Sequence, residues 1–347
     1  MRVLLSFLLF LVSVDAKAIN PPPPFSPRNA ESCTSIDARS ANPALAQHWA
    51  TPRDQDGIGW CYSYAAADVL TAALGKPISA TDLAYSYNLS VEDDTLTYVL
   101  KTVFFLNGQE DFQGGWSSEV LRLSQINGVC PESVLPSNGY FTSAQGDSVL
   151  KAVQVLQEMR DRIQVNQLSQ RAFIDCIHCQ ARLAEAGFQS LFPNMPLETI
   201  YQAIQNVNEG QINRVLFSLA QTYCRNNRIL PPQNMQVRAE TRHSRGAYNT
   251  FPTIDRILAS GGLVAITGSS QMYGVQFNGI HATAIVARQF RNGRCQYLVR
   301  NSWGRSCASY NHPDLLKEDC NASSGTIWMN EAHISHYVDR IDYVEMQ

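Results

Sequence analysis

The sequence lacks a strong charge of either sign. Its 347 residues include 27 Lys and Arg against 30 Asp and Glu, a net charge of −3, and only 16% of the residues are charged. This balance provides no basic field for a nucleic-acid backbone and no polybasic patch for an anionic membrane surface. The 45% hydrophobic share excludes a wholly disordered chain, and the length allows two domains around a sizeable core.

Long hydrophobic runs are also missing. The apolar run at the start, Val3 to Val14, has 12 residues, whereas a membrane-spanning helix needs about 20. Arg2 precedes this run and small residues follow it, so residues 1–18 are predicted to be a cleaved signal peptide. No later stretch is predicted to span a membrane. The chain is therefore expected in a secreted, periplasmic or lysosome-like exported compartment, where disulfides persist.

A proline-rich leader is predicted over residues 19–44. The four consecutive prolines Pro21 to Pro24 favour a stiff polyproline II spacer over a folded element. Folded structure is expected to begin near Pro43.

The most informative segment surrounds Cys61. A polar, glycine-containing loop precedes this residue, and the alanine-rich run Ser63 to Leu74 follows it. The run favours a helix that ends at Gly75. Cys61 is therefore predicted at a helix N-terminus, where the helix dipole and the unpaired amides favour a thiolate. Taken alone, such a cysteine is also typical of a small buried side chain or of half a disulfide.

A second segment, from Ile280 to Arg300, has the pattern of a β-hairpin. Two apolar runs flank Asn292-Gly293, a strong signal for a two-residue turn. His281 lies near the start of the first strand and Asn301 directly follows the second. Strict pairing would set His281 opposite Gly304, so a bulge or a bent strand end is needed to bring His281 and Asn301 together.

These residue types match the needs of a nucleophilic sulfur. A cysteine requires a base to accept its proton and an amide or carboxylate to orient that base. It also requires donors for the developing oxyanion. Gln55 lies six residues before Cys61 on the same loop, and its amide is predicted to point to the same place as the backbone N–H of Cys61.

Four motifs in this order resemble those of the papain-like cysteine peptidases. They are Gln55…Gly59-Trp60-Cys61-Tyr62, Gln113-Gly114-Gly115-Trp116, His281-Ala282, and Asn301-Ser302-Trp303-Gly304. The resemblance implies Cys61 as nucleophile, His281 as acid and base charged alongside the thiolate, Asn301 as the residue that orients the imidazole, and Gln55 in the oxyanion hole. It also implies substrate contacts from Gly114, Gly115, Trp60, Ala282 and Trp303, with Trp303 shielding the Asn–His contact.

The resemblance implies an α+β, papain-like two-lobed fold with a helical lobe and an antiparallel, β-barrel-like lobe. Spacing departs from the family, where histidine and asparagine lie roughly 130–150 residues after the cysteine; here they lie 220 and 240 after it. The surplus is assigned to an insertion that carries helical apolar stripes. The predicted units are therefore 45–140, the helical lobe with the nucleophile; 141–250, a helical insertion; and 251–347, the β-rich lobe with the histidine and asparagine.

The nine cysteines are consistent with one reactive thiol and four disulfides of unknown pairing. Cys176 and Cys179 are also typical of half a zinc site, but a second such pair is missing and the exported context favours disulfides. Cys224, on a neighbouring predicted helix, is a candidate partner for one of the two.

The predicted function is hydrolysis of peptide bonds in a peptide or protein substrate through a thioester acyl-enzyme. The implied chemistry needs no metal or organic cofactor, and no nucleic-acid or stable membrane partner is expected. Two alternatives stay open. One is an amidase or transpeptidase with the same triad, and the other is a catalytically silent relative that binds peptides or a partner protein.

Overall fold

The structure is a computed structural model with an α+β fold. It describes residues 28–55, 58–93, 114–137, 155–156, 158–163, 169–185, 188, 192, 194–205, 212–241, 250–275 and 279–347. The expected signal peptide and the proline run lie outside the described residues. None of the described helices has the length and apolar character needed to cross a membrane.

One antiparallel sheet organises the C-terminal part of the chain. Its strands follow the order β2-β8-β3-β4-β5-β7-β6, and β1 pairs with the far end of β4. The end strands β2 and β6 do not pair with each other, so the sheet is open within the described ranges rather than a closed barrel. The strands are β1 (Ile36–Asp37), β2 (Met235–Thr241), β3 (Val264–Ser269), β4 (Ile280–Arg291), β5 (Arg294–Arg300), β6 (Cys320–Asn321), β7 (Thr326–Asn330) and β8 (Val338–Met346).

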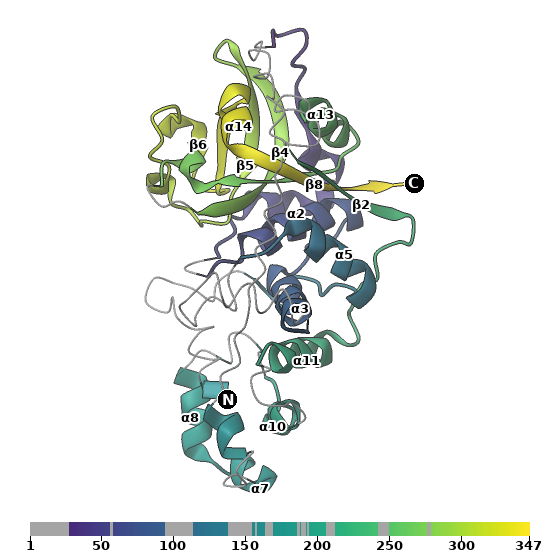
Figure 1. Ribbon diagram of the computed structural model, residues 1–347, viewed down its shortest axis with the longest axis vertical. Helices are drawn as coiled ribbons and strands as arrows, with labels where there is room; N and C mark the ends of the chain where they lie inside the picture. Colours follow the sequence, from purple (N-terminus) through teal and green to yellow (C-terminus); the bar gives the residue numbers. More distant parts are fainter. Residues whose placement is uncertain are drawn as a thin grey trace, which may run out of the picture.

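Helix α2 lies directly beneath this sheet and contacts β4, β3 and β8 (Figure 1). Helices α3, α5 and α11 lie below α2, and α7, α8 and α10 lie farthest from the sheet. The α-helices are α1 (Ala46–Ala50), α2 (Cys61–Leu74), α3 (Ala80–Asp93), α5 (Ser117–Asn127), α7 (Gln170–Ile174), α8 (Ile177–Glu185), α10 (Leu197–Gln205), α11 (Ile212–Cys224), α13 (Phe251–Ala259) and α14 (Glu331–Tyr337). Short 3-10 helices are η1 (Ala38–Ala41), η2 (Pro43–Leu45), η4 (Ser270–Tyr273), η5 (Cys307–Ser309) and η6 (Lys317–Asp319).

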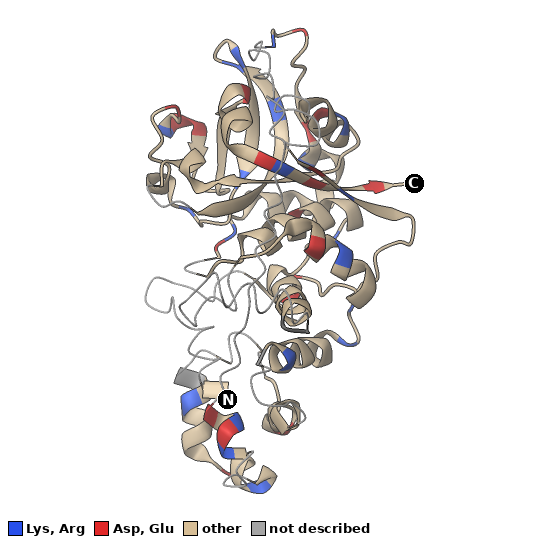
Figure 2. Ribbon diagram, viewed as in Figure 1, with Lys and Arg blue, Asp and Glu red and all other residues tan. Residues whose placement is uncertain are grey.

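Charged residues of both signs are interspersed over the sheet and the helices (Figure 2). This distribution agrees with the balanced composition of the sequence.

The predicted helix after Cys61 is confirmed as α2. It begins at Cys61 and ends at Leu74, and Gly75 follows in the left-handed conformation at φ 66°. The helix is buried from Cys61 to Thr71, because its alanines allow close approach to the sheet above and to α3 and α5 below.

The predicted hairpin is formed by β4 and β5, with the required bulge. The two strands pair from Arg291 with Arg294 to Ala284 with Arg300, and the register shifts between Ile285 and Ala287. The shifted register, continued toward the strand end, sets His281 opposite Trp303 rather than Gly304. After Arg300 the chain leaves β4, and the N–H of Asn301 donates to the carbonyl of Gly325.

The later half of the leader is folded, contrary to the expected start near Pro43. Strand β1 pairs with β4, and a disulfide joins Cys33 to Cys295 on β5. Arg28 forms ion pairs with Asp255 and Glu331. These contacts to residues far along the chain hold the segment to the sheet, and local composition does not reveal them.

The predicted insertion is not purely helical. Strand β2 falls within residues 141–250 and pairs with β8 along its whole length. A disulfide joins Cys224, at the end of α11, to Cys130 after α5. The segment from α11 to β2 is therefore joined to the rest of the fold by a disulfide and by strand pairing. The apolar stripes do lie in the core where described, as at Leu156, Ile200 and Val215.

All eight cysteines other than Cys61 form disulfides. The pairs are Cys33–Cys295, Cys130–Cys224, Cys176–Cys179 and Cys307–Cys320. Cys176 and Cys179 bind each other, so neither a zinc half-site nor a link to Cys224 is formed. The count of four disulfides and one free thiol agrees with the sequence. These disulfides fit an extracellular or secreted protein.

A buried ionic cluster around Asp68 joins α2 to the sheet. Arg300 on β5 donates from Nε to Asp68 Oδ2 at 3.1 Å, and Arg53 Nε lies 3.1 Å from Asp68 Oδ1. Arg300 also donates to the carbonyls of Trp49 and Thr51. Burial raises the pKa of Asp68, but the positive charges of Arg53 and Arg300 and the hydrogen bond with His48 outweigh burial and lower this pKa to about 2.

This cluster predicts a stability that depends on Asp68 and on pH. In Asp68→Asn two buried guanidinium groups lose their counter-ion, so the free energy of unfolding at pH 7 should fall by about 3–5 kcal/mol. Because the folded pKa of Asp68 is lowered, about 2 kcal/mol of wild-type stability should be present above pH 4 and lost as the pH falls from about 4 to about 2.

Urea denaturation of wild type and Asp68→Asn at several pH values measures the difference in their free energies of unfolding. This difference should become smaller toward acid pH. The exposed pair Glu119–Arg122 supplies the control, since Glu119→Gln should cost less than about 1 kcal/mol. A difference between wild type and Asp68→Asn that stays constant from pH 7 to pH 3 would contradict the assignment.

Candidate active site

Cys61 is the free cysteine of the chain, and it is the first residue of α2. Its side chain is buried, with the residue 8% exposed. The backbone of Ala282, the residue after His281, lies next to the thiol, as do the backbone groups of Tyr62 and of Cys61 itself. The packing of α2 on β4 therefore brings the sulfur beside a segment 220 residues away in sequence.

Burial and hydrogen bonding act in opposite directions on this thiol. Burial raises the pKa of Cys61 and is the largest influence, while the three backbone hydrogen bonds lower it. The net shift is upward. The sequence predicted only the lowering of the thiol pKa by backbone amides at a helix N-terminus. It did not predict the effect of burial, because the depth of the thiol depends on tertiary packing.

His281 and Asn301 lie at the same end of the β4–β5 hairpin. Nε2 of His281 is 2.8 Å from Oδ1 of Asn301, and both residues are buried. The same Oδ1 accepts a hydrogen bond from the backbone N–H of Ser302 at 2.7 Å. Since a backbone N–H only donates, the oxygen of the amide must lie at this position. His281 therefore donates from Nε2, and its Nδ1 carries the lone pair.

Burial also governs the charge of His281. It lowers the pKa of the imidazole to about 4, and the hydrogen bond with Asn301 offsets only part of this effect. Burial thus favours the neutral imidazole of His281 at neutral pH. The upward shift of the Cys61 pKa acts in the same sense, so burial favours the neutral thiol as well as the neutral imidazole.

Aromatic rings cover the His281–Asn301 pair. The rings of His281 and Trp303 are 4.5 Å apart between centroids. Tyr273 packs edge-on to both, at 5.4 Å from His281 and 4.9 Å from Trp303. Tyr310 stacks on Trp303 at 6.1 Å. Trp303 lies where a shield for the Asn–His contact is expected, and the sequence did not indicate the two tyrosines because they come from other segments.

Gln55 is held by contacts with two segments of the chain. Its backbone N–H donates to the carbonyl of Ser302 at 2.8 Å, and the Ser302 hydroxyl donates to its Oε1. Its Nε2 donates to the carbonyl of Ile58 at 2.7 Å. The side-chain nitrogen of an amide has two hydrogens. One hydrogen on Nε2 of Gln55 is used in the bond to Ile58, and the second does not take part in this bond.

The glycine segment lies against the loop that leads into α2. The N–H of Gly114 donates to the carbonyl of Gly59 at 2.9 Å, and Gly114 is exposed. A Cβ on Gly115 would lie 2.7 Å from Tyr87 and 2.8 Å from Tyr62, so only glycine fits there. Phe112 and Gln113, which precede this pair, lie outside the described residues.

Two of the expected substrate contacts are core residues. Trp60 is 1% exposed and packs edge-on to Tyr85 at 5.5 Å, so the structure does not bring its ring to a surface. Ala282 is also buried, and its backbone lies next to the Cys61 thiol. Ile280, which sequence reasoning did not single out, is 70% exposed directly beside His281.

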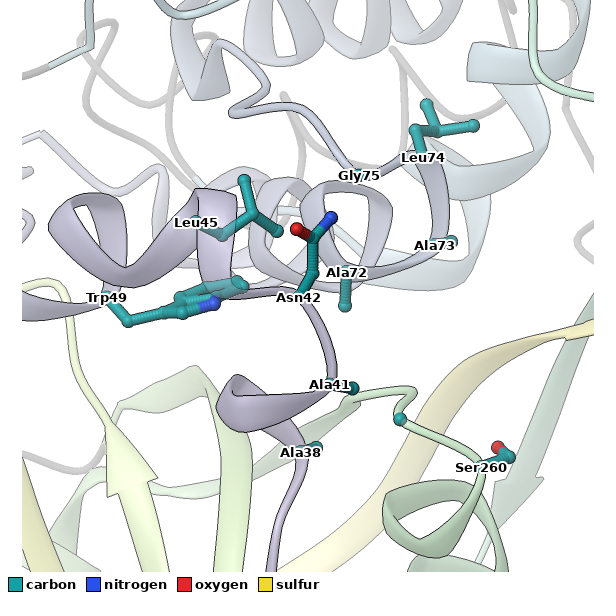
Figure 3. Close-up of a pocket in the computed structure, with 11 residues that line it drawn as sticks. Ala38, Ala41, Asn42, Leu45, Trp49, Ala72, Ala73, Leu74, Gly75 and Ser260 are labelled. Atoms are coloured by element: carbon teal, nitrogen blue, oxygen red, sulfur yellow. The ribbon is translucent and has the colours of Figure 1, made fainter.

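A separate pocket lies at the other end of α2, near Gly75 (Figure 3). Its volume is about 380 Å³, and helix geometry sets this end about 20 Å from Cys61. Most lining residues are small, and none carries a nucleophilic thiol or an ionisable group. It therefore offers no chemistry that competes with the arrangement around Cys61.

The geometry predicts a specific titration of His281. In the Cys61→Ser protein, ¹⁵N NMR of the imidazole should show the Nε2–H tautomer at pH 7 and protonation with a midpoint near 4. Asn301→Ala removes the acceptor, so the share of the Nε2–H tautomer should fall. A charged His281 at pH 6 would contradict the argument from burial.

Comparisons with known proteins add little to this geometry. No protein-family model matches the chain, and no curated protein matches it in sequence. Among solved structures, the chain is similar to PepW from Lactobacillus rhamnosis, with 14% identity and a TM-score of 0.39 over 84% of this chain and 79% of that one. It is also similar to SERA5E from Plasmodium falciparum, with 11% identity and a TM-score of 0.44 over 90% of this chain and 97% of that one. Likeness at this level establishes neither a family nor an activity.

Proposed function

We propose that the chain is an exported cysteine peptidase of papain-like, two-lobed arrangement that hydrolyses peptide bonds through a thioester. The observation that supports the proposal is the hydrogen bond between His281 and Asn301 beside the backbone that neighbours the free thiol. Ala282, the residue after His281, is next to the Cys61 thiol that opens α2. We therefore assign Cys61 as the nucleophile, His281 as the base and Asn301 as the amide that orients it.

In the proposed reaction the neutral pair is the starting state. The sulfur of Cys61 attacks the peptide carbonyl, and its proton passes to Nδ1 of His281. The charged imidazolium formed in this step is stabilised by its Nε2–H bond to Asn301. His281 then gives the proton to the leaving amine, the C–N bond breaks, and a thioester remains on Cys61. Water, deprotonated by His281, releases the acid and restores the thiol.

The developing oxyanion needs donors in the same place. We assign this role to the backbone N–H of Cys61 and to the second Nε2–H of Gln55. The contacts of Gln55 with Ser302 and Ile58 hold its side chain in one orientation. Exposed Gly114 beside Gly59 is the proposed partner for the substrate backbone, since an absent Cβ leaves its surface open.

The central test is turnover of a peptide library by the mature wild-type protein and by Cys61→Ala. The variant should lose turnover completely while keeping the circular dichroism and melting temperature of the wild type, because it removes one sulfur atom only. After acid quenching, mass spectrometry of the wild-type protein should show a covalent acyl adduct on Cys61. Equal cleavage by Cys61→Ala would overturn the proposal.

A second variant tests the oxyanion role of Gln55 separately. Gln55→Glu keeps the acceptor oxygen for the Ser302 hydroxyl and replaces the N–H donors by a carboxylate oxygen. We expect kcat to fall by about 10²–10³ with little change in KM, since the lost interaction belongs to the transition state. Ser32→Ala, at an exposed position beside the Cys33–Cys295 disulfide and thus near the turn end of the hairpin, serves as the control and should match the wild type.

The burial of Cys61 favours one alternative, a silent relative that binds peptides without cleaving them. In that case labelled peptides should bind the wild type and Cys61→Ala equally, and neither protein should release products.

An amidase or transpeptidase is distinguished by adding an amine acceptor, since transfer would yield a new amide in place of the free acid.

A further inference from the structure

A loop closed by the disulfide Cys307–Cys320 packs against helix α14. His312 and Asp314 lie on this loop, and His333 lies on α14. Nδ1 of His312 is 3.8 Å from Oδ2 of Asp314, and Nδ1 of His333 is 3.7 Å from the same oxygen. One ligand atom from each residue lies within 4.8 Å of the other two. Three donor atoms from two segments therefore converge at one point.

His333 brings an unsatisfied nitrogen to this point. The residue is 4% exposed, and its Nε2 lies 2.8 Å from the carbonyl oxygen of Met272. Since a carbonyl only accepts, Nε2 carries the hydrogen and Nδ1 carries the lone pair. Nδ1 is buried and has no hydrogen-bond partner. A buried lone pair facing a carboxylate oxygen is unfavourable unless a cation or a proton lies between them.

His312 has the same arrangement. Its Nδ1 accepts a hydrogen bond from the backbone N–H of Asp314 at 3.1 Å, so the lone pair is on Nδ1. Its Nε2 lies 2.8 Å from the hydroxyl of Tyr337 and donates to it. Both imidazoles thus hold their Nε2–H on a protein oxygen and direct Nδ1 toward Asp314. Protein oxygens that fix the far nitrogen in this way are typical of metal-ligating histidines.

The geometry points to a divalent zinc-class cation site formed by Nδ1 of His312, Nδ1 of His333 and a carboxylate oxygen of Asp314. Imidazole donors select Zn²⁺ and related ions over Mg²⁺ and Ca²⁺, which prefer oxygen. In a tetrahedral site with bonds of about 2.0–2.1 Å, neighbouring ligand atoms lie about 3.3 Å apart. The observed distances are 3.7 and 3.8 Å to Asp314 and at most 4.8 Å between the ligand atoms of the two histidines, so the donors must approach one another by up to about 1.5 Å.

Metal binding would break one hydrogen bond of the present structure. The metal would take the lone pair of His312 Nδ1, so the backbone N–H of Asp314 would donate to water instead, which it can reach because Asp314 is exposed. The carboxylate of Asp314 is 65% exposed, so the fourth ligand position faces solvent and takes water. Two histidines, one carboxylate and one water complete a four-coordinate shell.

The site would fasten the disulfide-closed loop to the aromatic cover of His281. Tyr310, two residues before His312, stacks on Trp303. The N–H of Asn311 donates to the carbonyl of Tyr273 at 2.9 Å. Gly274 lies so close to the loop that a Cβ there would be 2.1 Å from the N of His312. The assigned role of the metal is therefore to hold this loop and its tyrosine in place.

Calorimetric titration of Zn²⁺ into the untagged, chelator-treated full mature chain tests the site. The Cys61→Ser background removes the thiol, so that zinc cannot bind between Cys61 and His281. We expect one Zn²⁺ per chain and a rise in melting temperature on binding. Co²⁺ in place of Zn²⁺ should give visible absorption bands of a four-coordinate site, and Mg²⁺ should not compete.

Asp314→Asn is the decisive variant because its side chain is exposed and its loss should not unfold the protein. It should weaken Zn²⁺ binding at least tenfold, whereas Glu318→Gln, an exposed carboxylate on the same loop, should bind as the background does. His333→Gln should abolish the Co²⁺ bands. Absence of saturable Zn²⁺ binding, or equal affinity in Asp314→Asn and Glu318→Gln, overturns the site whether or not the chain is a peptidase.

Discussion

The carboxylate of Asp68 holds together the three segments that carry the candidate site. It lies on α2, seven residues after Cys61, and it pairs with Arg300, which directly precedes Asn301. It also pairs with Arg53, two residues before Gln55. A charge buried between a helix and a sheet is costly unless its partners stay in place. Moving α2 relative to β5 or to the Gln55 loop would separate Asp68 from its arginine partners. The free-energy cost of an unpaired buried charge therefore opposes this movement.

The burial that stabilises the fold also sets the protonation of the site. Cys61 and His281 are each less than 10% exposed, and low-dielectric surroundings favour the neutral form of both. Hydrogen bonds to the thiol and to the imidazole act against this preference without outweighing it. A proton transfer between the two groups creates both charges together, and their mutual attraction then offsets part of the desolvation that each would suffer alone.

Contacts distant in sequence link the edges of the molecule to this centre. The leader is attached to the sheet through Cys33 and β1, and the insertion contributes β2 to the same sheet. The loop that carries His312 supplies Tyr310 to the aromatic cover over His281. The proposed metal site and the candidate catalytic pair are thus connected through packed rings, although no motif joins them in the sequence.

Three local features could be predicted from the sequence alone: the helix that begins at Cys61 and ends before Gly75, the Asn292-Gly293 hairpin, and the odd cysteine left after four disulfides. These follow from short-range rules of capping, turn geometry and counting. Long-range packing sets how deeply Cys61 and His281 are buried, how the disulfides pair, where β2 lies and how close Asp314 comes to two histidines. Such features depend on contacts between residues far apart in the chain, and local propensity contains no information about them.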